Sequence, residues 1–332
     1  MKIDIFPHIL PKRYKDAFHK EATGLGSFRD LHNAIPTLWD LDYRFQIMDK
    51  FPDLMQVLTI ASPPVENIKD PQKAIDLAKL ANDEMAELIQ KYPDRFAAAI
   101  ACVPMNNMDA ALDEVDRAIN DLKFRGVQIF TPINDKPLDS PEFFPLYEKM
   151  CQYNLPIWIH PQREIDYPDY RTEKMSQYAI NASLGWPYET SVAMVRLILS
   201  GTLARYPDLK FITHHCGAMV PFLAKRITGF AESSERLSKR RTTGNIRKPV
   251  MDYLKMFYND TAIYGYTPGL MCAYALCGAE HLLFGTDMPF DGQYGLRYTR
   301  ETIESIEQMD ISDAEKKMIF EDNAKRLLRL DV

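Results

Sequence analysis

Short hydrophobic runs and longer amphipathic segments alternate along the whole sequence. Several of the runs are almost continuous in apolar residues, which is typical of strands that are buried on both faces. Eight such runs occur, at 2–6, 54–60, 96–103, 126–130, 155–159, 210–213, 256–259 and 281–284. The pattern therefore predicts eight buried strands spread from one end of the chain to the other.

The segments between the runs carry helix signals. Asp70 followed by Pro71 is typical of a helix start, because aspartate caps the first turn and proline fits its first position. The apolar residues that follow share one helical face: Ala74, Leu77, Ala78, Ala81, Met85 and Leu88. A second helix is expected from Pro187 to Gly201, and Ser312 with a glutamate three residues later predicts a capping box near the C-terminus.

Eight strands that alternate with helices favour an α/β fold, a single (β/α)8 barrel over residues 1–332. A doubly wound open sheet is the second possibility. No repeat, linker or change of composition divides the chain. The stretches 11–40 and 162–186 are longer than barrel loops need to be, and long loops after strands usually cover a site.

Composition excludes several classes of protein. The chain has 40 Lys and Arg against 46 Asp and Glu, a net charge of −6, and its basic run at 238–241 is too short for a nucleic-acid surface. The longest apolar run, at 96–105, is well below the roughly 18 residues of a membrane span, and the N-terminus lacks a signal-peptide core. The five cysteines form no CxxC pair. We therefore expect a soluble cytoplasmic protein that binds neither nucleic acid nor membrane.

Side chains with reactive groups fall where the predicted strands end. His8, His160, Asp260 and Asp287 each follow a run, and His214 and His215 follow another: four of the seven histidines are at strand ends. The carboxyl ends of barrel strands build the active face, and converging imidazole and carboxylate groups suit a divalent metal ion. No G-x-S-x-G elbow and no glycine-rich phosphate loop is present, so no nucleotide cofactor is expected.

Short motifs along nearly the whole chain resemble those of the amidohydrolase-related decarboxylases, the group of aminocarboxymuconate-semialdehyde and gamma-resorcylate decarboxylases. The motifs stand in order as Met1-Lys2-Ile3-Asp4-Ile5, His8-Ile9-Leu10-Pro11, Trp39-Asp40 with Arg44 and Met48-Asp49, Ile159-His160-Pro161, Pro187-Tyr188-Glu189-Thr190, His215 with Gly217 and Pro221-Phe222, Arg226-Ile227, Phe257-Tyr258 with Asp260, and Gly285-Thr286-Asp287 with Pro289-Phe290. Each motif is short, but their common order makes the resemblance specific.

The resemblance implies a role for individual residues. His8, His160 and Asp287 match metal ligands, with zinc expected and manganese as the alternative. His215 matches the histidine that orients or deprotonates metal-bound water, and either His215 or Asp287 is expected to handle the proton. His214 has no counterpart in the pattern and is expected to be a packing residue.

Two arginines match residues that bind a substrate carboxylate, Arg44 and Arg226. Guanidinium groups pair with carboxylates through two parallel hydrogen bonds, which suits this role. The resemblance implies that Arg226 reaches the site across a homodimer interface. For each arginine, an ordinary ion pair on a surface or helix face is the alternative.

The chain departs from the family pattern at the end of its first strand. There the family usually has His-x-His, whereas this sequence has Phe6-Pro7-His8. A phenyl ring does not bind metal, so one expected ligand is missing. The site is then a three-ligand site, a site that has recruited another group, or a site without metal.

The sequence as a whole predicts a metal-dependent, non-oxidative decarboxylase of a small hydroxy- or amino-substituted aromatic or muconate-like carboxylic acid. One alternative is a hydrolase of the same superfamily that cleaves a lactone, a C–C bond or an amide with metal hydroxide. Another is a binding protein on a barrel that has lost catalysis, which Phe6 motivates. The loops that would set the substrate carry no pattern that identifies it.

Overall fold

The protein is described here by a computed structural model that covers residues 1–23, 25–238 and 243–332. In this part of the chain the strands are β1 (Lys2–Asp4), β2 (His8–Ile9), β3 (Leu54–Ile60), β4 (Phe96–Ala99), β5 (Ala101–Cys102), β6 (Val127–Thr131), β7 (Ile157–Pro161), β8 (Phe211–Thr213) and β9 (Tyr258–Asn259). β1 lies in the first predicted run and β2 follows that run, whereas β4 and β5 both lie in the third. Every predicted run thus contains a strand except the last.

All strand pairs are parallel, and their order follows the chain. β3 pairs with β1, β2 and β4, and a second sheet runs β5-β6-β7-β8-β9. The eighth run joins the two edges: Leu283 N donates to Asn259 O at 2.9 Å, and Ile5 N donates to Phe284 O at 2.9 Å. The last run therefore connects β9 to the first run, and the predicted amidohydrolase-type barrel is confirmed.

The register of the strands aligns their carboxyl ends. Thr131 at the end of β6 pairs with Pro161 at the end of β7, and Ile159 pairs with Thr213 at the end of β8. Residues that directly follow these positions consequently lie on one rim of the barrel. This alignment brings the candidate site residues together.

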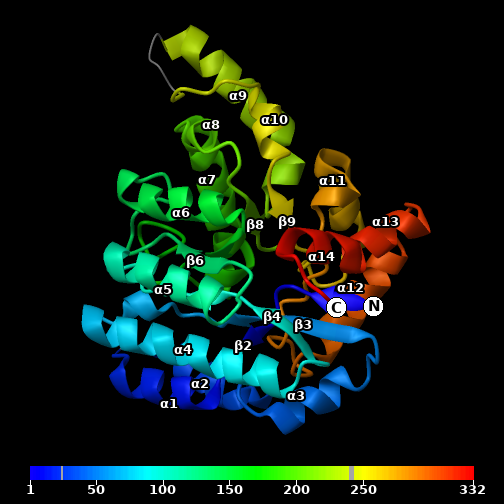
Figure 1. The fold of residues 1–332 in the computed structure, drawn as a ribbon. Helices are drawn as coiled ribbons and strands as arrows, with labels where there is room; N and C mark the ends of the chain where they lie inside the picture. The colour runs from blue at the N-terminus through cyan, green and yellow to red at the C-terminus, as the bar shows by residue number, and fades with distance from the viewer. Residues whose placement is uncertain (24, 239–242) are drawn as a thin grey trace.

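Helices surround the strands (Figure 1). Their bounds are α1 (Lys12–Glu21), α2 (Ser27–Ala34), α3 (Leu41–Met48), α4 (Pro71–Lys91), α5 (Met108–Asn120), α6 (Phe144–Tyr153), α7 (Trp186–Leu199), α8 (Thr202–Arg205), α9 (Val220–Ser238), α10 (Val250–Leu254), α11 (Thr267–Cys277), α12 (Leu296–Glu307), α13 (Asp313–Lys317) and α14 (Asn323–Leu328). Short 3₁₀ or π segments are η1 (Pro36–Leu38), η2 (Val65–Asn67), η3 (Pro141–Phe143), η4 (Asn181–Gly185), η5 (Ala279–His281) and η6 (Met318–Asp322). α9 extends beyond the barrel at the top of Figure 1.

The predicted helix starts are present. The Asp70 side chain accepts from the backbone of Gln72 at 2.9 Å and caps α4, and Ser312 and Glu315 form the predicted capping box of α13. α7 begins at Trp186, one residue before Pro187, and the π segment η4 leads into it.

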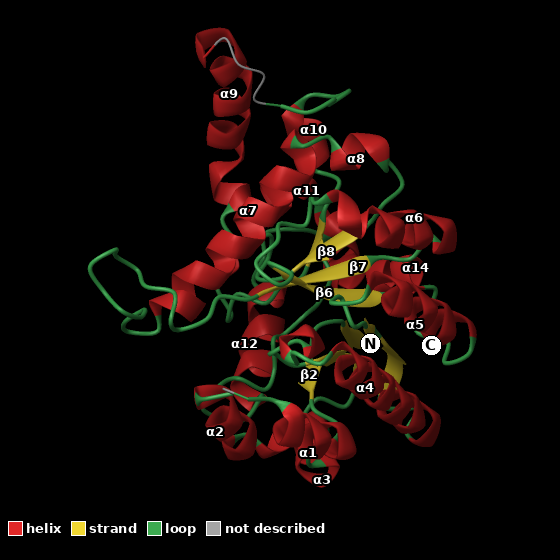
Figure 2. Ribbon diagram, turned by 90° about the vertical axis from the view of Figure 1, so that its left-hand side faces the viewer, coloured by secondary structure: helices red, strands yellow, loops and turns green. Residues whose placement is uncertain are grey.

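The two long stretches differ in structure. The stretch 11–40 contains α1, α2 and η1. The stretch 162–186 contains a long loop, which projects from the barrel before α7 (Figure 2), and ends in η4.

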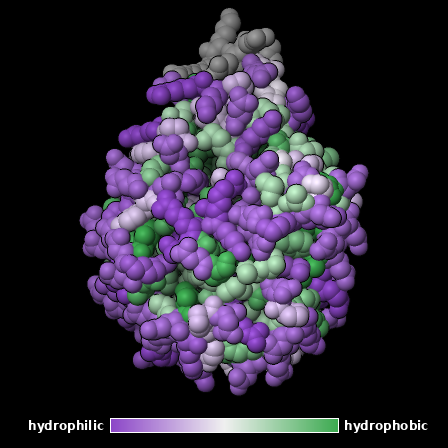
Figure 3. All heavy atoms as spheres, turned by 45° about the vertical axis from the view of Figure 1, so that its right-hand side comes forward, coloured by the Kyte–Doolittle hydropathy of each residue, from purple (hydrophilic) through white to green (hydrophobic). Residues whose placement is uncertain are grey.

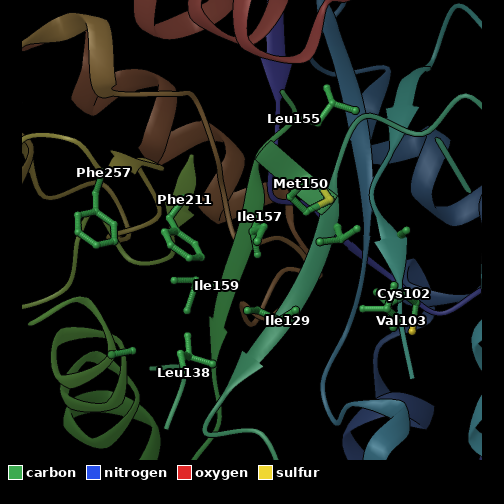
Figure 4. Packing of buried hydrophobic residues seen from close by; sticks show 14 of the residues in the cluster. Cys102, Val103, Ile129, Leu138, Met150, Leu155, Ile157, Ile159, Phe211 and Phe257 are labelled. Carbon is green, nitrogen blue, oxygen red and sulfur yellow. The ribbon is translucent and has the colours of Figure 1, made fainter. Parts of the chain in front are cut away.

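Buried apolar side chains form two layers. The larger cluster fills the space between the strands and the helices, and Figure 4 shows Ile129, Ile157 and Phe211 of three neighbouring strands within it. The smaller cluster contains Phe6 and Trp158 and fills the barrel interior. On the face shown in Figure 3 apolar residues form patches between polar ones, which is usual because apolar atoms make up much of any protein surface.

Among the described residues, no helix is both long and apolar enough to cross a bilayer. The sequence analysis weighed the basic run at 238–241 as a nucleic-acid surface. Its three basic residues, at 239–241, lie outside the described part of the chain.

Candidate active site

The site is built where the parallel strands end. His8 lies in β2, His160 is the penultimate residue of β7, and Asp287 follows the eighth run. His214 and His215 follow β8 directly. The structure thus brings together the three residues that the sequence analysis expected to bind metal, and it adds His214 at their centre.

His8, His214 and Asp287 meet at short distances in the barrel interior. Nε2 of His8 and Nε2 of His214 each lie 3.3 Å from Oδ1 of Asp287. Both nitrogen atoms are buried, and neither has a hydrogen-bond partner among the described residues. Buried polar atoms are normally satisfied, so two unpartnered nitrogen atoms that face one carboxylate oxygen indicate space for a ligand between them.

His160 completes the group of imidazoles. One ligand atom each from His8, His160 and His214 lies within 4.8 Å of the others, and His214, His215 and Asp287 form a second such group. Nδ1 of His160 donates to the carbonyl oxygen of Pro161 at 2.7 Å, which leaves its Nε2 as the nitrogen with a lone pair. Neutral imidazole and carboxylate are the ligands that zinc and manganese accept, so the residues present fit a divalent ion.

The sequence analysis expected His214 to be a packing residue, and the structure gives it polar contacts in addition to its packing. Its Nδ1 is hydrogen-bonded to Oδ2 of Asp260, and its Nε2 faces Asp287. Burial would lower the pKa of His214, but the two carboxylates reverse this effect and raise it to about 9. The ring of Phe6 lies parallel to the imidazole at a centroid distance of 4.0 Å. Phe6 thus packs against the cluster and contributes no ligand atom.

Burial and the charge of His214 also shift the pKa values of the other ionisable groups in the site. Burial lowers the pKa values of His8 and His160, and neighbouring histidines lower that of His160 further. Burial would raise the pKa of Asp287, but the charge of His214 and the close contacts with His8 and His215 pull it well below its usual value. Asp287 is therefore a carboxylate at neutral pH and can serve as a ligand or as a partner for cations.

His215 differs from His214 in its surroundings. It lines a cavity, and its Nε2 lies 3.7 Å from Oδ2 of Asp287. Burial and the charge of His214 lower the pKa of His215. Tyr264 lies on the same side and donates from its hydroxyl to Oδ2 of Asp287 at 2.9 Å. His215 and Tyr264 are therefore the polar groups that connect the cluster with the cavity.

The cavity at this rim has a volume of about 760 Å³ and walls that are mostly apolar. Its floor includes His160, His215 and Asp287. The walls come from α2, the η4–α7 segment, the turn before α9 and the loops near 263 and 290: Phe28, Leu31, Ser62, Ala179, Ala182, Ser183, Leu184, Trp186, Pro187, Ala218, Met219, Ala262, Ile263, Tyr264 and Phe290. Both long stretches of the sequence contribute residues, as expected for loops that cover a site. A concave apolar pocket with a few converging polar groups is typical of a small-molecule site.

Neither of the two arginines that were expected to bind a carboxylate lines the cavity of its own chain. Arg44 is fully buried in α3 and donates to Gln56 Oε1 at 2.8 Å, to His8 O at 2.9 Å and to Thr37 O at 3.2 Å. Arg226 is exposed on α9, where its guanidinium lies over the ring of Phe230. Neither lysine nor arginine is among the described residues that line the cavity.

Several site residues were not expected from the sequence. Asp260 was noted as a strand-end residue and in a family motif but was given no role. Trp186 was noted only as the end of the long stretch 162–186, and Tyr264 was not singled out. His214 could have been found from its position directly after a strand. Its role was hidden because strand alternation predicts opposite directions for two neighbouring side chains.

Comparison with known proteins gives relatives over the whole barrel. The family model described as Amidohydrolase matches residues 8–330. A gamma-resorcylate decarboxylase of Rhizobium sp. is 30% identical over 87% of each chain, and a 2-amino-3-carboxymuconate-6-semialdehyde decarboxylase of Dictyostelium discoideum is 28% identical over 100% of this chain and 92% of its own. The crystal structure of a dihydroxybenzoic acid decarboxylase from Polaromonas sp. with bound manganese and the inhibitor 2-nitroresorcinol superposes with a TM-score of 0.81, at 26% identity over 100% of this chain and 97% of that one. The family predicted from the motifs is confirmed, and the chain belongs to the amidohydrolase family.

Proposed function

We propose that this chain is a metal-dependent, non-oxidative decarboxylase of a small hydroxy- or amino-substituted aromatic or muconate-like carboxylic acid, folded as one domain over 1–332. The observation that carries the proposal is the buried group of His8, His160, His214 and Asp287 beneath the 760 Å³ cavity. The named decarboxylases among the relatives, which match over nearly the whole chain, support the reaction type.

His8, His160 and Asp287 are the residues that we propose to hold the ion, which is zinc in our proposal and manganese in the alternative. Bound there, a divalent ion supplies positive charge next to a substrate oxygen and stabilises negative charge that develops during the reaction. The carboxylate of Asp287 and the neutral imidazoles suit this task, because ligands must be deprotonated.

The protein's own part in the reaction is to orient the acid and to move a proton. Decarboxylation breaks the bond between the substrate carbon and its carboxylate and releases carbon dioxide. The electron pair of that bond stays on the carbon, which takes up a proton that an acid in the site delivers. His215 and Asp287 are our candidates for proton transfer, because both line the cavity and lie in contact with each other. The lowered pKa of His215 makes its protonated form a stronger acid and keeps the resting form neutral.

The apolar walls of the cavity also have a function in this proposal. Trp186 and Phe290 have their rings near His160 and His8, at centroid distances of 5.7 and 5.5 Å. An aromatic substrate stacks well on such walls, and the exclusion of water strengthens every charge interaction in the site.

The substrate carboxylate needs a cation, and we propose that Arg226 of a second protomer supplies it in a homodimer. Arg226 is exposed on α9, and two aromatic side chains of the same helix are exposed beside it, Phe222 at 84% and Phe230 at 62%. Exposed apolar patches of this kind often mark protein–protein contacts. Arg44 is not proposed for this role, because its guanidinium is fully buried and bonded to other groups of the protein.

All five cysteines are free in the structure. Free cysteines fit a reducing compartment, and we propose a cytoplasmic enzyme on this basis.

The function is tested by measuring carbon dioxide release from a panel of hydroxy- and aminobenzoates with zinc- and manganese-loaded protein. The proposal expects release from at least one acid and its loss in His215→Asn. Hydrolysis of lactones or amides without release of carbon dioxide would favour the hydrolase, and a metal-free protein without turnover would favour a binding protein.

A further inference from the structure

A fourth side chain converges on the same point as the three proposed ligands. His214 is completely buried and does not line the cavity, so it contacts the cluster and not the space for substrate. Its Nε2 and that of His8 are each 3.3 Å from the same carboxylate oxygen of Asp287. The usual hydrogen-bond distance is about 2.7–3.2 Å, and neither nitrogen makes a hydrogen bond within the described part of the chain.

The separation of these atoms suits metal ligands. Ligand atoms at about 2.0–2.1 Å from a tetrahedral zinc ion are about 3.3–3.4 Å apart. The distances from His8 and His214 to Asp287 therefore equal the edges of such a tetrahedron. One ligand atom of the third imidazole, that of His160, lies within 4.8 Å of a ligand atom of each of the other two histidines.

Asp260 holds His214 in the orientation that a ligand needs. Its Oδ2 is bonded to Nδ1 of His214, which leaves Nε2 free to face the cluster. Its Oδ1 accepts from the backbone N–H groups of Cys216 at 2.8 Å and Ala262 at 3.0 Å, so the carboxylate is itself fixed. A histidine that binds metal through one nitrogen usually donates the other to a carboxylate or carbonyl group. His160 has the same arrangement, with Pro161 O as its acceptor.

Phe6 occupies the side of the cluster next to His214. It is on the same strand face as His8, two residues away, and its ring is stacked on the imidazole of His214. The phenyl ring closes this side of the cluster without supplying a donor atom. A four-ligand protein site consequently requires His214.

We infer that His214 is a fourth protein ligand of the metal site, held by Asp260 as a positioning residue, and that it makes up for the absence of a donor at Phe6. The inference rests on the metal dependence that the proposed function includes. The inference gives the two adjacent histidines different roles: His214 binds the ion, and His215 faces the substrate. The competing possibility is a metal-free site in which an imidazolium at His214 bridges Asp260 and Asp287.

The test measures bound metal and not only turnover. Wild-type protein and variants are dialysed against zinc, metal content is determined by mass spectrometry, and affinity is measured by competition with a chromogenic chelator. We expect about one ion per wild-type chain. His214→Gln should lower the affinity roughly 100-fold or more, and Asp260→Asn roughly 10- to 100-fold, the usual effect of losing a partner that orients a ligand. Substitution with cobalt adds a spectroscopic readout, because the visible absorption of cobalt(II) reports its ligands.

Controls and a rescue variant keep the test decisive. His281 is half-buried, stacks on Tyr258 and lies outside the cluster, so His281→Gln should keep the metal. Circular dichroism and thermal unfolding identify variants that fail to fold. In Phe6→His/His214→Gln, the new imidazole beside His8 should restore metal that His214→Gln lost.

Unchanged zinc affinity and an unchanged cobalt spectrum in folded His214→Gln would overturn the inference and leave the proposed decarboxylase intact. A wild-type protein that binds no metal would also overturn it. Carbon dioxide release, measured separately, then decides whether the proposed reaction survives without metal.

Discussion

Arg44 provides a sharp test of the difference between a substrate-binding arginine and a structural one. Its guanidinium is completely buried and donates to Gln56, to the backbone of His8 and to the backbone of Thr37. Burial lowers the pKa of Arg44 to about 10, and the charge of Asp4 acts in the opposite direction. Arg44→Met removes the charge but keeps much of the side-chain volume.

The expected cost follows from these contacts. Hydrogen bonds from a charged group contribute about 1.5–3 kcal/mol each, but they are not additive. Removal of one member of a buried charged network typically costs about 3–5 kcal/mol, because the acceptors that remain lose their partners in a dry environment. We therefore expect Arg44→Met to lower the free energy of unfolding by about 3–5 kcal/mol, with little effect on KM in protein that stays folded.

Urea unfolding at fixed metal and protein concentration measures the stability, and initial rates of decarboxylation give KM. Arg297 on α12 offers a matched control, since its exposed side chain pairs with Glu301 at 2.9 Å. Arg297→Met should leave the free energy of unfolding unchanged within the error of the measurement. If Arg44→Met kept its stability within about 1 kcal/mol and raised KM tenfold or more, the assignment of Arg44 as a structural residue would be wrong.

Three further predictions concern proton transfer, assembly and pH. His215→Asn should keep fold and metal but lower turnover roughly 10²-fold or more, the usual scale for a general acid or base, and unchanged turnover would remove His215 from the mechanism. Arg226→Ala should lower kcat/KM about 10- to 100-fold, and mixing it with inactive Asp287→Ala should restore part of the activity in heterodimers. No recovery despite confirmed subunit exchange would mean that Arg226 does not act across the interface. Burial raises the pKa of Asp4 from 3.8 to about 6, so the folded state holds its proton more tightly than the unfolded state does. The stability from this group is complete below about pH 4 and is lost, up to about 3 kcal/mol, as pH rises through 6, and Asp4→Asn should flatten this part of the measured stability curve.

The barrel could be predicted from the sequence because its strands are buried on both faces. A run such as 155–159 is apolar without interruption, and the structure gives β7 at Ile157–Pro161. The register of parallel strands then brings their ends to one rim, which is why His8, His160 and Asp287 could be placed together without coordinates.

The division of roles between His214 and His215 depends on a backbone turn that no periodicity reveals. Strand alternation would send the two side chains to opposite faces, but the chain enters left-handed conformations at His215, with φ of 55°, and at Cys216, with φ of 56°. This turn brings the two imidazoles to a centroid distance of 3.9 Å. Both therefore reach the site, one at its buried side and one at the cavity.

The burial of Arg44 could not be predicted for a related reason. The charge of an arginine in an isolated sequence suggests a surface or a ligand, and its burial is decided by residues far away, such as Gln56 and Asp4. Tyr264 was missed because its contact with Asp287 joins two loops that are 23 residues apart. Contacts between loops depend on tertiary packing and leave no periodic signal.

The most direct test of the account is to measure metal content and carbon dioxide release on the same samples before chelation, after chelation and after zinc or manganese is added back. For a substrate found in the hydroxy- and aminobenzoate panel, the account predicts that about one ion per chain and the release of carbon dioxide are lost together and return together. Full release by metal-free protein, or no release from any acid by fully loaded protein, would contradict it.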